Sequence, residues 1–185
     1  NAREGLEAIR SEGQRAGDMI RSLQALTRNA APVLAQVDMH QAIRHILAIS
    51  RNEIERRQIA LKLSLDAEPA HAFGDDIQLQ QVILNLVVNA IDAMGEIHDR
   101  PRLLHLATRL VDDQWLEVSV ADTGTGIGPD LAEQVFEPFY TTKVNGMGMG
   151  LAICKSIVEA HRGQLRAEAL APHGSRFAFS IPRQQ

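Results

Sequence analysis

The segment that most constrains the fold is QLQQVILNLVVNAIDAM, residues 78 to 94, because its periodicity matches one long helix. We predict that this helix runs from Asp75 to about Met94. Polar side chains recur every three or four residues and share one face: Gln78, Gln81, Asn85, Asn89 and Asp92. Apolar residues cover the rest: Leu79, Val82, Ile83, Leu86, Val87, Ala90 and Ile91.

The polar face of this helix is unusual in being made of short amides. Surface helices favour Lys, Glu and Arg, whereas Asn is a poor helix former whose carbonyl oxygen can ligate a hard cation. Asn85 and Asn89 are spaced i, i+4 and point the same way. The pair is compatible with a cation site, and also with an ordinary solvated face.

Residues 3 to 28 contain no proline and predict a separate helix. Its apolar or small residues follow a 3-4-3-4-3 spacing that draws one seam: Leu6, Ile9, Gly13, Ala16, Ile20 and Leu23. Such a seam pairs with a partner helix or packs on the helix's own domain. Pro32 stops the helix after a short linker, so we expect residues 1–31 to form one part of the chain and residues 32–185 another.

The second part mixes helices and strands. Asp38 caps a predicted helix that reaches about Arg57 and has an apolar side of Ala42, Ile43, Ile46, Leu47, Ile49 and Ile54. We expect a half-buried strand at 59–65, a short extended stretch at 70–74, a strand hairpin at 102–111 and 115–121, a helix at 148–161, and strands at 164–170 and 175–181. Helices and hairpins segregate, so the expected fold class is α+β, a two-layer α/β sandwich.

The motif ADTGTGIGPD follows a predicted strand and contains Asp122, Gly124 and Gly126. The glycines permit a tight turn and close approach of a ligand to the backbone. A carboxylate accepts a hydrogen bond from the exocyclic amine of adenine, but would face the carbonyl of guanine as a second acceptor. The motif therefore fits an adenine site, and it also fits a plain glycine-rich turn with a capping Asp.

About 25 residues between Asp122 and Gly148 lack periodicity, a length that favours a functional lid. Within them, FEPFYTTK offers Phe136 and Phe139, which we expect to dock the segment on a neighbouring surface. Lys143 follows, and its ammonium could meet a phosphate.

The last motif, GMGMGLAI, places Gly146, Gly148 and Gly150 at the start of a predicted helix. Free backbone N–H groups and the helix dipole make such a terminus an anion site, although three glycines could also form a hinge. The motif is neither GxGxxG nor a GxxxxGK[ST] P-loop.

These four motifs, in this order, supply different parts of one Mg-nucleotide site. From about Asp38 to Pro182 the sequence resembles the catalytic domain of sensor histidine kinases, which share a nucleotide-binding fold with gyrase, mismatch-repair and chaperone ATPases. FEPFYTTK is most similar to the nitrogen-regulatory and oxygen-sensing branches. The resemblance implies a Bergerat-type ATP-binding fold preceded by one long dimerisation helix.

The resemblance also implies roles for individual residues. Asn89 should coordinate Mg²⁺ with help from Asn85, Asp122 should bind adenine with Ser175 nearby, and Lys143 should reach the terminal phosphates of ATP. The remaining expected nucleotide contacts are Gly124, Gly126, Gly146, Gly148, Gly150 and Leu151. The segment from about Gly126 to Met147 should close over ATP as a lid.

Asn85 separates two possible activities. The hydrolytic relatives carry a water-activating glutamate at this position, and an amide lacks that basicity, so transfer to a histidine is favoured over hydrolysis. None of the histidines is followed by the acidic and apolar residues of the family's acceptor box: His40, His45, His71, His98, His105, His161 and His173. The helix at 3–28 matches the second helix of the dimerisation hairpin, so this chain alone should not phosphorylate itself.

The expected partners are the chain's own dimerisation and phosphoacceptor helix, a second copy in the full-length protein, and a response-regulator receiver domain. A net charge of −4 gives no basic field for nucleic acid. No apolar run approaches about 20 residues, so we expect no membrane contact here and a cytoplasmic location, with a parent protein that could be membrane-anchored. The lone Cys154 is expected to be a buried structural thiol.

Two rival functions stay open from the sequence. In one, the nucleotide site survives only as a non-catalytic binding module. In the other, the chain is an ATP-hydrolysing conformational clamp of the gyrase or chaperone type.

Overall fold

The structure is a computed structural model that describes residues 33–142 and 147–184, except the side chain of Pro129. These residues lie within one compact unit, Pro32–Gln185. The predicted helix at 3–28, with its linker and Pro32, falls outside the described residues, as do Lys143 and Gly146.

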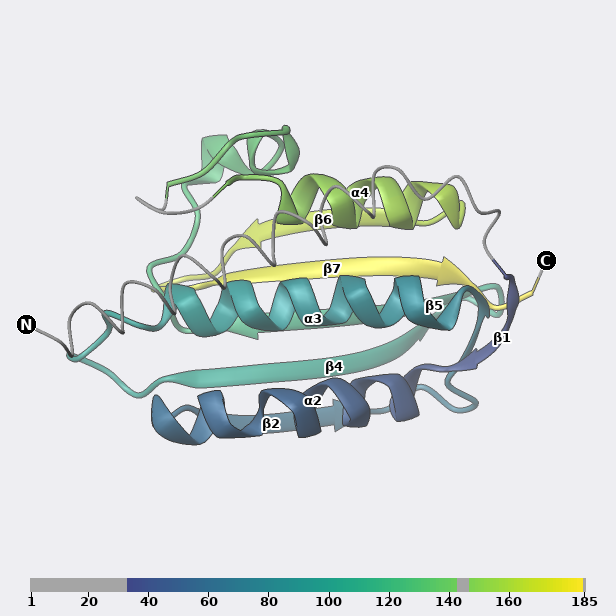
Figure 1. Cartoon of the computed structure of the whole chain (residues 1–185), viewed down its shortest axis with the longest axis horizontal. Coiled ribbons are helices and arrows are strands. Elements are labelled where there is room, and N and C mark those ends of the chain that lie inside the picture. The colour runs from purple at the N-terminus through teal and green to yellow at the C-terminus, as the bar shows by residue number, and fades with distance from the viewer. Residues whose placement is uncertain (1–32, 143–146, 185) are drawn as a thin grey trace, which may run out of the picture. The chain divides into compact units, whose positions relative to one another are not determined.

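Within the described residues the chain forms two layers, a five-stranded sheet and three helices that cover one of its faces (Figure 1). The sheet order is β2-β4-β5-β7-β6, with β2 and β4 parallel and the other neighbours antiparallel. The bounds are β2 Ala60–Leu65, β4 Leu103–Val111, β5 Trp115–Asp122, β6 Gln164–Ala169 and β7 Ser175–Pro182, with helices α2 Met39–Arg56, α3 Asp76–Ala93 and α4 Gly150–Ala160. The predicted α+β two-layer fold is confirmed.

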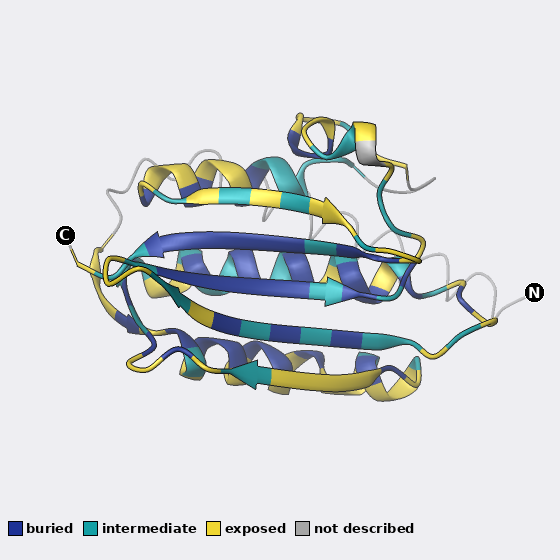
Figure 2. Ribbon diagram, turned by 180° about the vertical axis from the view of Figure 1, so that it is seen from behind, coloured by how far each residue is buried: buried dark blue, intermediate teal, exposed yellow. Residues whose placement is uncertain are grey.

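The core lies between α3 and the central strands β5 and β7. All seven apolar residues predicted for α3 are buried. Alternate residues of the two strands face them, Leu116, Val118 and Val120 from β5 and Phe177, Phe179 and Ile181 from β7, and all are buried. Seen from behind in Figure 2, β5 and β7 are the most continuously buried strands. Burying each large apolar side chain contributes about 1.5–3 kcal/mol, so this layer holds the domain together.

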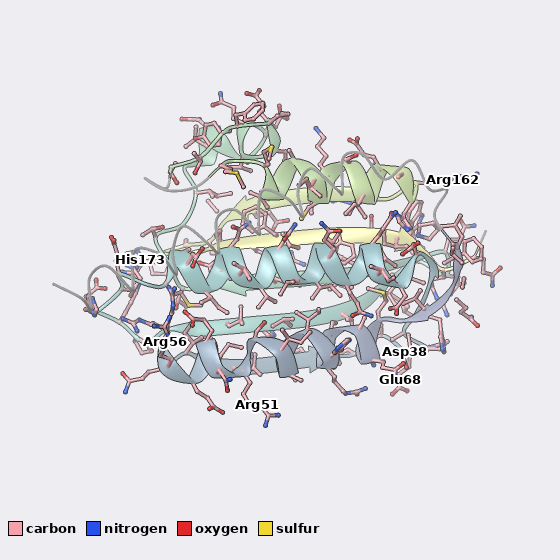
Figure 3. The ribbon with its side chains drawn as sticks, in the orientation of Figure 1. Asp38, Arg51, Arg56, Glu68, Arg162 and His173 are labelled. Carbon is pink, nitrogen blue, oxygen red and sulfur yellow. The ribbon has the colours of Figure 1, made fainter. Side chains whose placement is uncertain are left out.

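Helix α2 begins where the sequence predicts. The Asp38 carboxylate accepts hydrogen bonds from the backbone N–H groups of His40 and Gln41, which have no partner inside the helix. Figure 3 places Asp38 and Arg56 at opposite ends of α2, so negative charge lies at its N-terminus and positive charge at its C-terminus.

A second, two-stranded sheet was not predicted. Strands β1, Ala35–Asp38, and β3, His71–Gly74, pair antiparallel. The backbone N–H of Met39 donates to the carbonyl of Ala70, which extends this contact into the start of α2. The pair fixes where α2 and α3 enter the domain.

Two predictions about burial were wrong. Ile49 was placed on the apolar side of α2, but it is 60% exposed. Strand β2 was expected to be half-buried, yet Leu61 and Leu63 are 43% and 44% exposed. The reason is that β2 forms an edge of the sheet and pairs only with β4 among the described strands.

Candidate functional site

The candidate site begins at Asp122, the last residue of β5. Its side chain is only 3% exposed. One carboxylate oxygen, Oδ1, accepts a hydrogen bond from the backbone N–H of Gly124 at 2.8 Å, and the other, Oδ2, accepts one from the hydroxyl of Ser175, also at 2.8 Å. Burial raises the pKa of Asp122 above its ordinary value, and the hydrogen bonds from Ser175 and Gly124 partly oppose this. The structure therefore brings Asp122, Gly124 and Ser175 together as predicted.

The turn that follows Asp122 lies against the C-terminal end of α3. The backbone N–H of Thr125 donates to the carbonyl of Ala93 at 3.1 Å. A Cβ on Gly124 would lie 2.6 Å from that same carbonyl oxygen, so glycine is required by close approach rather than by an unusual φ. This contact joins the Asp122 end of the site to the amide helix.

Two glycines with positive φ complete this end of the site. Gly126 has φ +76° and Gly174 has φ +98°. The backbone oxygen of Gly174 lies near the position of a Cβ on Gly126, and a Cβ on Gly174 would overlap the carbonyl oxygen of Asp122. The turn after β5 and the turn before β7 therefore pack backbone against backbone, which is possible because both positions are glycine.

The amide face of α3 meets the start of α4 at Asn85. Its side-chain Nδ2 donates to the carbonyl of Gly150 at 3.4 Å. Nearby, the fully buried thiol of Cys154 in α4 donates to the carbonyl of Val82 in α3 at 3.9 Å. Asn89 lies one turn further along α3, is half-buried and has a polar contact of its own. The predicted proximity of Asn85 to the glycine motif is thus observed.

The N-terminus of α4 has the features predicted for an anion site. Met149 precedes the helix and provides no side-chain cap, so its side chain leaves the first backbone N–H groups open to another acceptor. Apart from its chain neighbours and the backbone of α4 itself, no described residue would lie within 4 Å of a Cβ on Gly150. Leu151, in the first turn, is half-buried.

Gly148 is held by the aromatic segment. It has φ +65°, and a Cβ here would lie 2.5 Å from the carbonyl oxygen of Tyr140. The backbone N–H of Phe139 donates to the carbonyl of Gly148 at 3.0 Å. The glycine therefore serves a close backbone crossing between the aromatic segment and the start of α4.

The lid region contains two short 3₁₀ turns, Pro129–Leu131 and Gln134–Phe136. The ring of Phe136 packs edge-to-face on Phe177 of β7, with ring centroids 6.3 Å apart, so its predicted docking is confirmed. For Phe139 the prediction was wrong, because its side chain is 75% exposed. Its φ is +68°, and its backbone rather than its ring contacts the start of α4, through the bond to Gly148.

The C-terminal turn of α3 carries Asp92, the last residue of the amide face. Arg57, at the end of α2, approaches its carboxylate at 3.5 Å and also donates to the carbonyl of Ile91. The arginine thus lies where the helix dipole favours a cation.

In the described part of the chain, side-chain hydrogen bonds are made by four histidines: His40, His98, His105 and His161. The ring of His161 accepts from the backbone N–H of Asp75 and donates to the carbonyl of Ile157, so it joins α4 to the start of α3. His40 is bonded to Thr108, and His105 to Ser64, and burial lowers the pKa of both imidazoles. The two bonds of His161 give it a structural role at the end of α4.

The sequence did not point to Arg100, which contacts the turn after Asp122. No motif or periodicity marks this residue, because it lies in an irregular loop between α3 and β4. Among the described residues, no group of three or more His, Cys, Asp or Glu side chains could hold a metal ion. Nor is any helix in this part of the chain long and apolar enough to cross a membrane.

Comparison with known proteins adds to this geometry. The family model described as histidine kinase-, DNA gyrase B-, and HSP90-like ATPase matches residues 74–185. Sensor histidine kinase TmoS of Ectopseudomonas mendocina is 36% identical over 183 residues, which are 98% of this chain and 19% of TmoS. The chain therefore spans about a fifth of the length of that relative.

Solved structures have the same fold. The nucleotide-free catalytic domain of histidine kinase ThkA has a TM-score of 0.72 at 30% identity, covering 81% of this chain and 95% of that domain. Histidine kinase ThkA in complex with the response regulator protein TrrA has a TM-score of 0.80 at 26% identity, covering 96% of this chain and 50% of that one.

Proposed function

The chain belongs to the histidine kinase-, DNA gyrase B-, and HSP90-like ATPase family and carries a histidine kinase-type catalytic domain; from this premise we propose that it donates the γ-phosphate of ATP to a histidine on a separate helix. The phosphate then passes to an aspartate of a response regulator. The observation that carries the proposal is the buried Asp122 carboxylate, whose two oxygens are held by Ser175 and Gly124.

Adenine binds at Asp122 in this proposal. Both hydrogen bonds to the carboxylate orient it as an acceptor, and burial makes an unsatisfied charge there costly. The exocyclic amine of adenine supplies a further donor, which compensates that cost. Guanine presents a carbonyl at the same position and is disfavoured.

The phosphate chain binds at the start of α4. Uncapped backbone N–H groups and the helix dipole favour an anion there, and Gly148, Gly150 and Leu151 line its approach. Lys143 and Gly146, which lie outside the described residues, complete the contacts to the phosphates.

In this proposal the amide face of α3 is the part of the chain that would hold Mg²⁺. Asn89 and Asn85 provide neutral oxygen ligands, and Mg²⁺ is commonly bound by few protein ligands plus substrate phosphates. When bound, the ion neutralises charge on the phosphates during transfer.

The identity of Asn85 favours transfer over hydrolysis. Its amide donates to the carbonyl of Gly150 and has no basic group with which to activate water. The site therefore holds ATP until an acceptor nucleophile arrives, and the covering segment from about Gly126 to Met147 excludes water meanwhile.

The acceptor and the partners follow from this chemistry. We propose that residues 1–31 form the second helix of a dimerisation hairpin and residues 32–185 the catalytic domain, in a dimeric cytoplasmic kinase. The complex of ThkA with TrrA supports a response regulator as the phosphate recipient. Placement in the nitrogen-regulatory or oxygen-sensing branch stays a prediction.

A transfer assay tests the proposal. The protein is mixed with labelled Mg-ATP and a separately produced helical acceptor domain of a sensor histidine kinase, and the acceptor is examined for acid-labile, base-stable phosphate. We expect label on the acceptor and none when its histidine is replaced. ATP binding without transfer would support the non-catalytic module instead, and rapid steady hydrolysis without an acceptor would support the clamp.

A further inference from the structure

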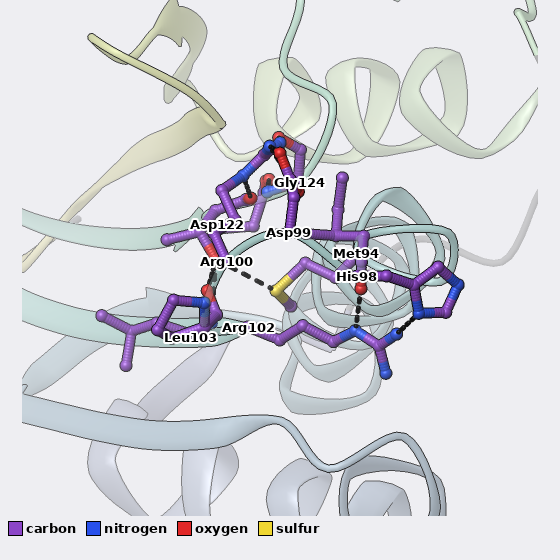
Figure 4. A network of polar contacts seen from close by, with 11 residues as sticks. Met94, His98, Asp99, Arg100, Arg102, Leu103, Asp122 and Gly124 are labelled. Atoms are coloured by element: carbon purple, nitrogen blue, oxygen red, sulfur yellow. Dashed lines mark hydrogen bonds and ion pairs between the residues drawn. The ribbon is translucent and has the colours of Figure 1, made fainter.

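The loop between α3 and β4 is bonded to the turn that carries the adenine contact. Figure 4 shows this network, in which Met94, Arg100 and Leu103 lie beside the turn from Asp122 to Gly124. The bonds involve two backbone carbonyls of the turn and the hydroxyl of Thr123, so together they act on the conformation of the turn. Their centre is Arg100, whose side chain is 20% exposed.

The guanidinium of Arg100 donates to two successive carbonyls of the turn. Its Nε donates to the carbonyl of Thr123 at 3.0 Å, and its Nη2 donates to the carbonyl of Gly124 at 2.8 Å. The third nitrogen, Nη1, binds both oxygens of Asp99 at 3.0 and 3.1 Å. A planar fork of donors suits two neighbouring carbonyls, which a lysine ammonium cannot match in geometry.

Each of these carbonyls belongs to a peptide unit whose N–H group is also bonded. In a planar trans peptide the C=O and N–H bonds point in opposite directions. Holding the Thr123 carbonyl on one side therefore directs the N–H of Gly124 to the other, where it donates to Oδ1 of Asp122 at 2.8 Å. Holding the Gly124 carbonyl likewise directs the N–H of Thr125 to the carbonyl of Ala93.

The Thr123 side chain holds the same turn from a third direction. Its hydroxyl accepts from the backbone N–H of Leu103 and donates to the carbonyl of Pro101, both at 2.9 Å. Threonine thus ties the turn to the first residue of β4, whereas Arg100 binds the carbonyls of both peptide planes at once.

We propose that Arg100 is a positioning residue for adenine recognition. It fixes the two peptide planes after Asp122, and so keeps the Gly124 N–H on one carboxylate oxygen and leaves the carboxylate oriented toward the base. The inference rests on the proposed ATP site, and it concerns the base end of the nucleotide and not the phosphate end.

Arg102 provides a matched control. It lies two residues away in the same loop and also donates to two backbone carbonyls, those of Ile97 and Arg57, at 2.8 and 2.6 Å. Neither carbonyl belongs to the turn after Asp122. Replacing either arginine by alanine removes similar bonds, but only Arg100→Ala releases the peptide planes of the turn.

The test measures binding of ATP, adenosine and inorganic triphosphate by calorimetry. For Arg100→Ala we expect affinities for ATP and adenosine to fall by about tenfold each, the loss of roughly one charged hydrogen bond, with triphosphate affinity unchanged. Arg102→Ala should leave all three affinities unchanged. Arg100→Lys retains a cation but loses the planar pair of donors, so its affinities for ATP and adenosine should lie between those of wild type and Arg100→Ala.

The outcomes separate this inference from the proposed function. A wild-type protein that binds no ATP refutes the proposed function itself. Equal ATP affinities of wild type, Arg100→Ala and Arg100→Lys would overturn the role of Arg100. So would a loss of triphosphate affinity in Arg100→Ala as large as its loss of ATP affinity. If Arg100→Ala does not fold, the affinities of Arg100→Lys decide between these outcomes. Hydrogen exchange at the Gly124 N–H should also be faster in Arg100→Lys than in wild type.

Discussion

The hydroxyl of Ser175 donates a hydrogen bond to Oδ2 of Asp122 at 2.8 Å, across 53 positions of sequence. Ser175 begins β7 and Asp122 ends β5, so the antiparallel pairing of these strands brings the two side chains together. The base end of the site is therefore a product of sheet register, and a shift of one residue would turn one partner to the other face.

Replacing Asp122 by asparagine should separate stability from binding. In Asp122→Asn the amide keeps a similar shape while a buried charge is removed, so the melting temperature of the nucleotide-free protein at neutral pH should be unchanged or higher. ATP affinity should fall by about ten- to a hundredfold, because a charged acceptor for the adenine amine is lost. Thermal unfolding and calorimetry measure the two effects, and a variant that binds ATP normally would contradict the assignment of Asp122.

Adenosine affinity should depend on pH through the same carboxyl. Burial raises the pKa of Asp122 above 3.8. The protonated carboxyl therefore contributes to the free energy of unfolding. This contribution is present below the pKa of Asp122 in the unfolded chain and is lost as pH rises through its pKa in the folded protein. Adenosine affinity should change with pH in the opposite direction. The ionised carboxylate of Asp122 only accepts hydrogen bonds, so it binds the amine of adenine better than the protonated carboxyl does.

The measurement is a series of adenosine titrations from neutral pH down to about pH 4, the ordinary range of an aspartate carboxyl, in which affinity should fall. Adenosine is used as the ligand in place of ATP because a terminal phosphate group itself titrates, with a pKa of about 6. Asp122→Asn serves as the control, and its lower affinity should not vary with pH. A wild-type curve as flat as that of the variant would show that Asp122 does not titrate with binding.

Substitutions on the amide face should abolish phosphate transfer. Asn85→Asp places a carboxylate opposite the carbonyl of Gly150, and the facing acceptors should also lower the free energy of unfolding by about 1–2 kcal/mol. Asn89→Ala removes the principal proposed ligand of Mg²⁺. Labelled transfer to a supplied acceptor measures both, and Gln80→Ala, whose side chain donates to Asp76 on the same helix, is the control that should keep activity.

The two phenylalanines of the aromatic segment should differ sharply in their effect on stability. Phe136 is buried against Phe177, so Phe136→Ala should lower the free energy of unfolding by about 3 kcal/mol. Phe139 is exposed, and Phe139→Ala should change it by less than about 0.5 kcal/mol. Urea unfolding provides both values, and equal losses would contradict the observed burial.

Cys154 should resist alkylation in the native protein. Burial raises the pKa of its thiol to about 12, so almost no thiolate exists at neutral pH. Iodoacetamide labelling followed by mass spectrometry should detect modification only after denaturation. Rapid labelling of the folded protein would show that the α3–α4 contact opens.

The elements with strong periodicity could be predicted from the sequence. The cap at Asp38, the helix α3 and the hairpin of β4 and β5 depend on local patterns, and the structure confirms them. The association of Asp122 with Gly124 was equally local, since the two residues lie in one turn.

Features that depend on distant neighbours could not be predicted in this way. Strand β1 has four residues and acquires its strand character by pairing with β3. The exposure of Leu61 and Leu63 follows from the position of β2 at the sheet edge, which no alternation of residues encodes. Arg100 acts on carbonyl groups 23 and 24 residues away, and its own neighbours show no motif.

Gly174 limits how the base preference of this protein could be redesigned. Its φ of +98° and the overlap that a Cβ would make with the Asp122 carbonyl exclude other residues at this position without movement of the backbone. Engineering for guanine or for an unnatural base must therefore act through the side chains at 122 and 175. Because Gly174 brings the two strands close, few positions near the base can be substituted to change the base preference.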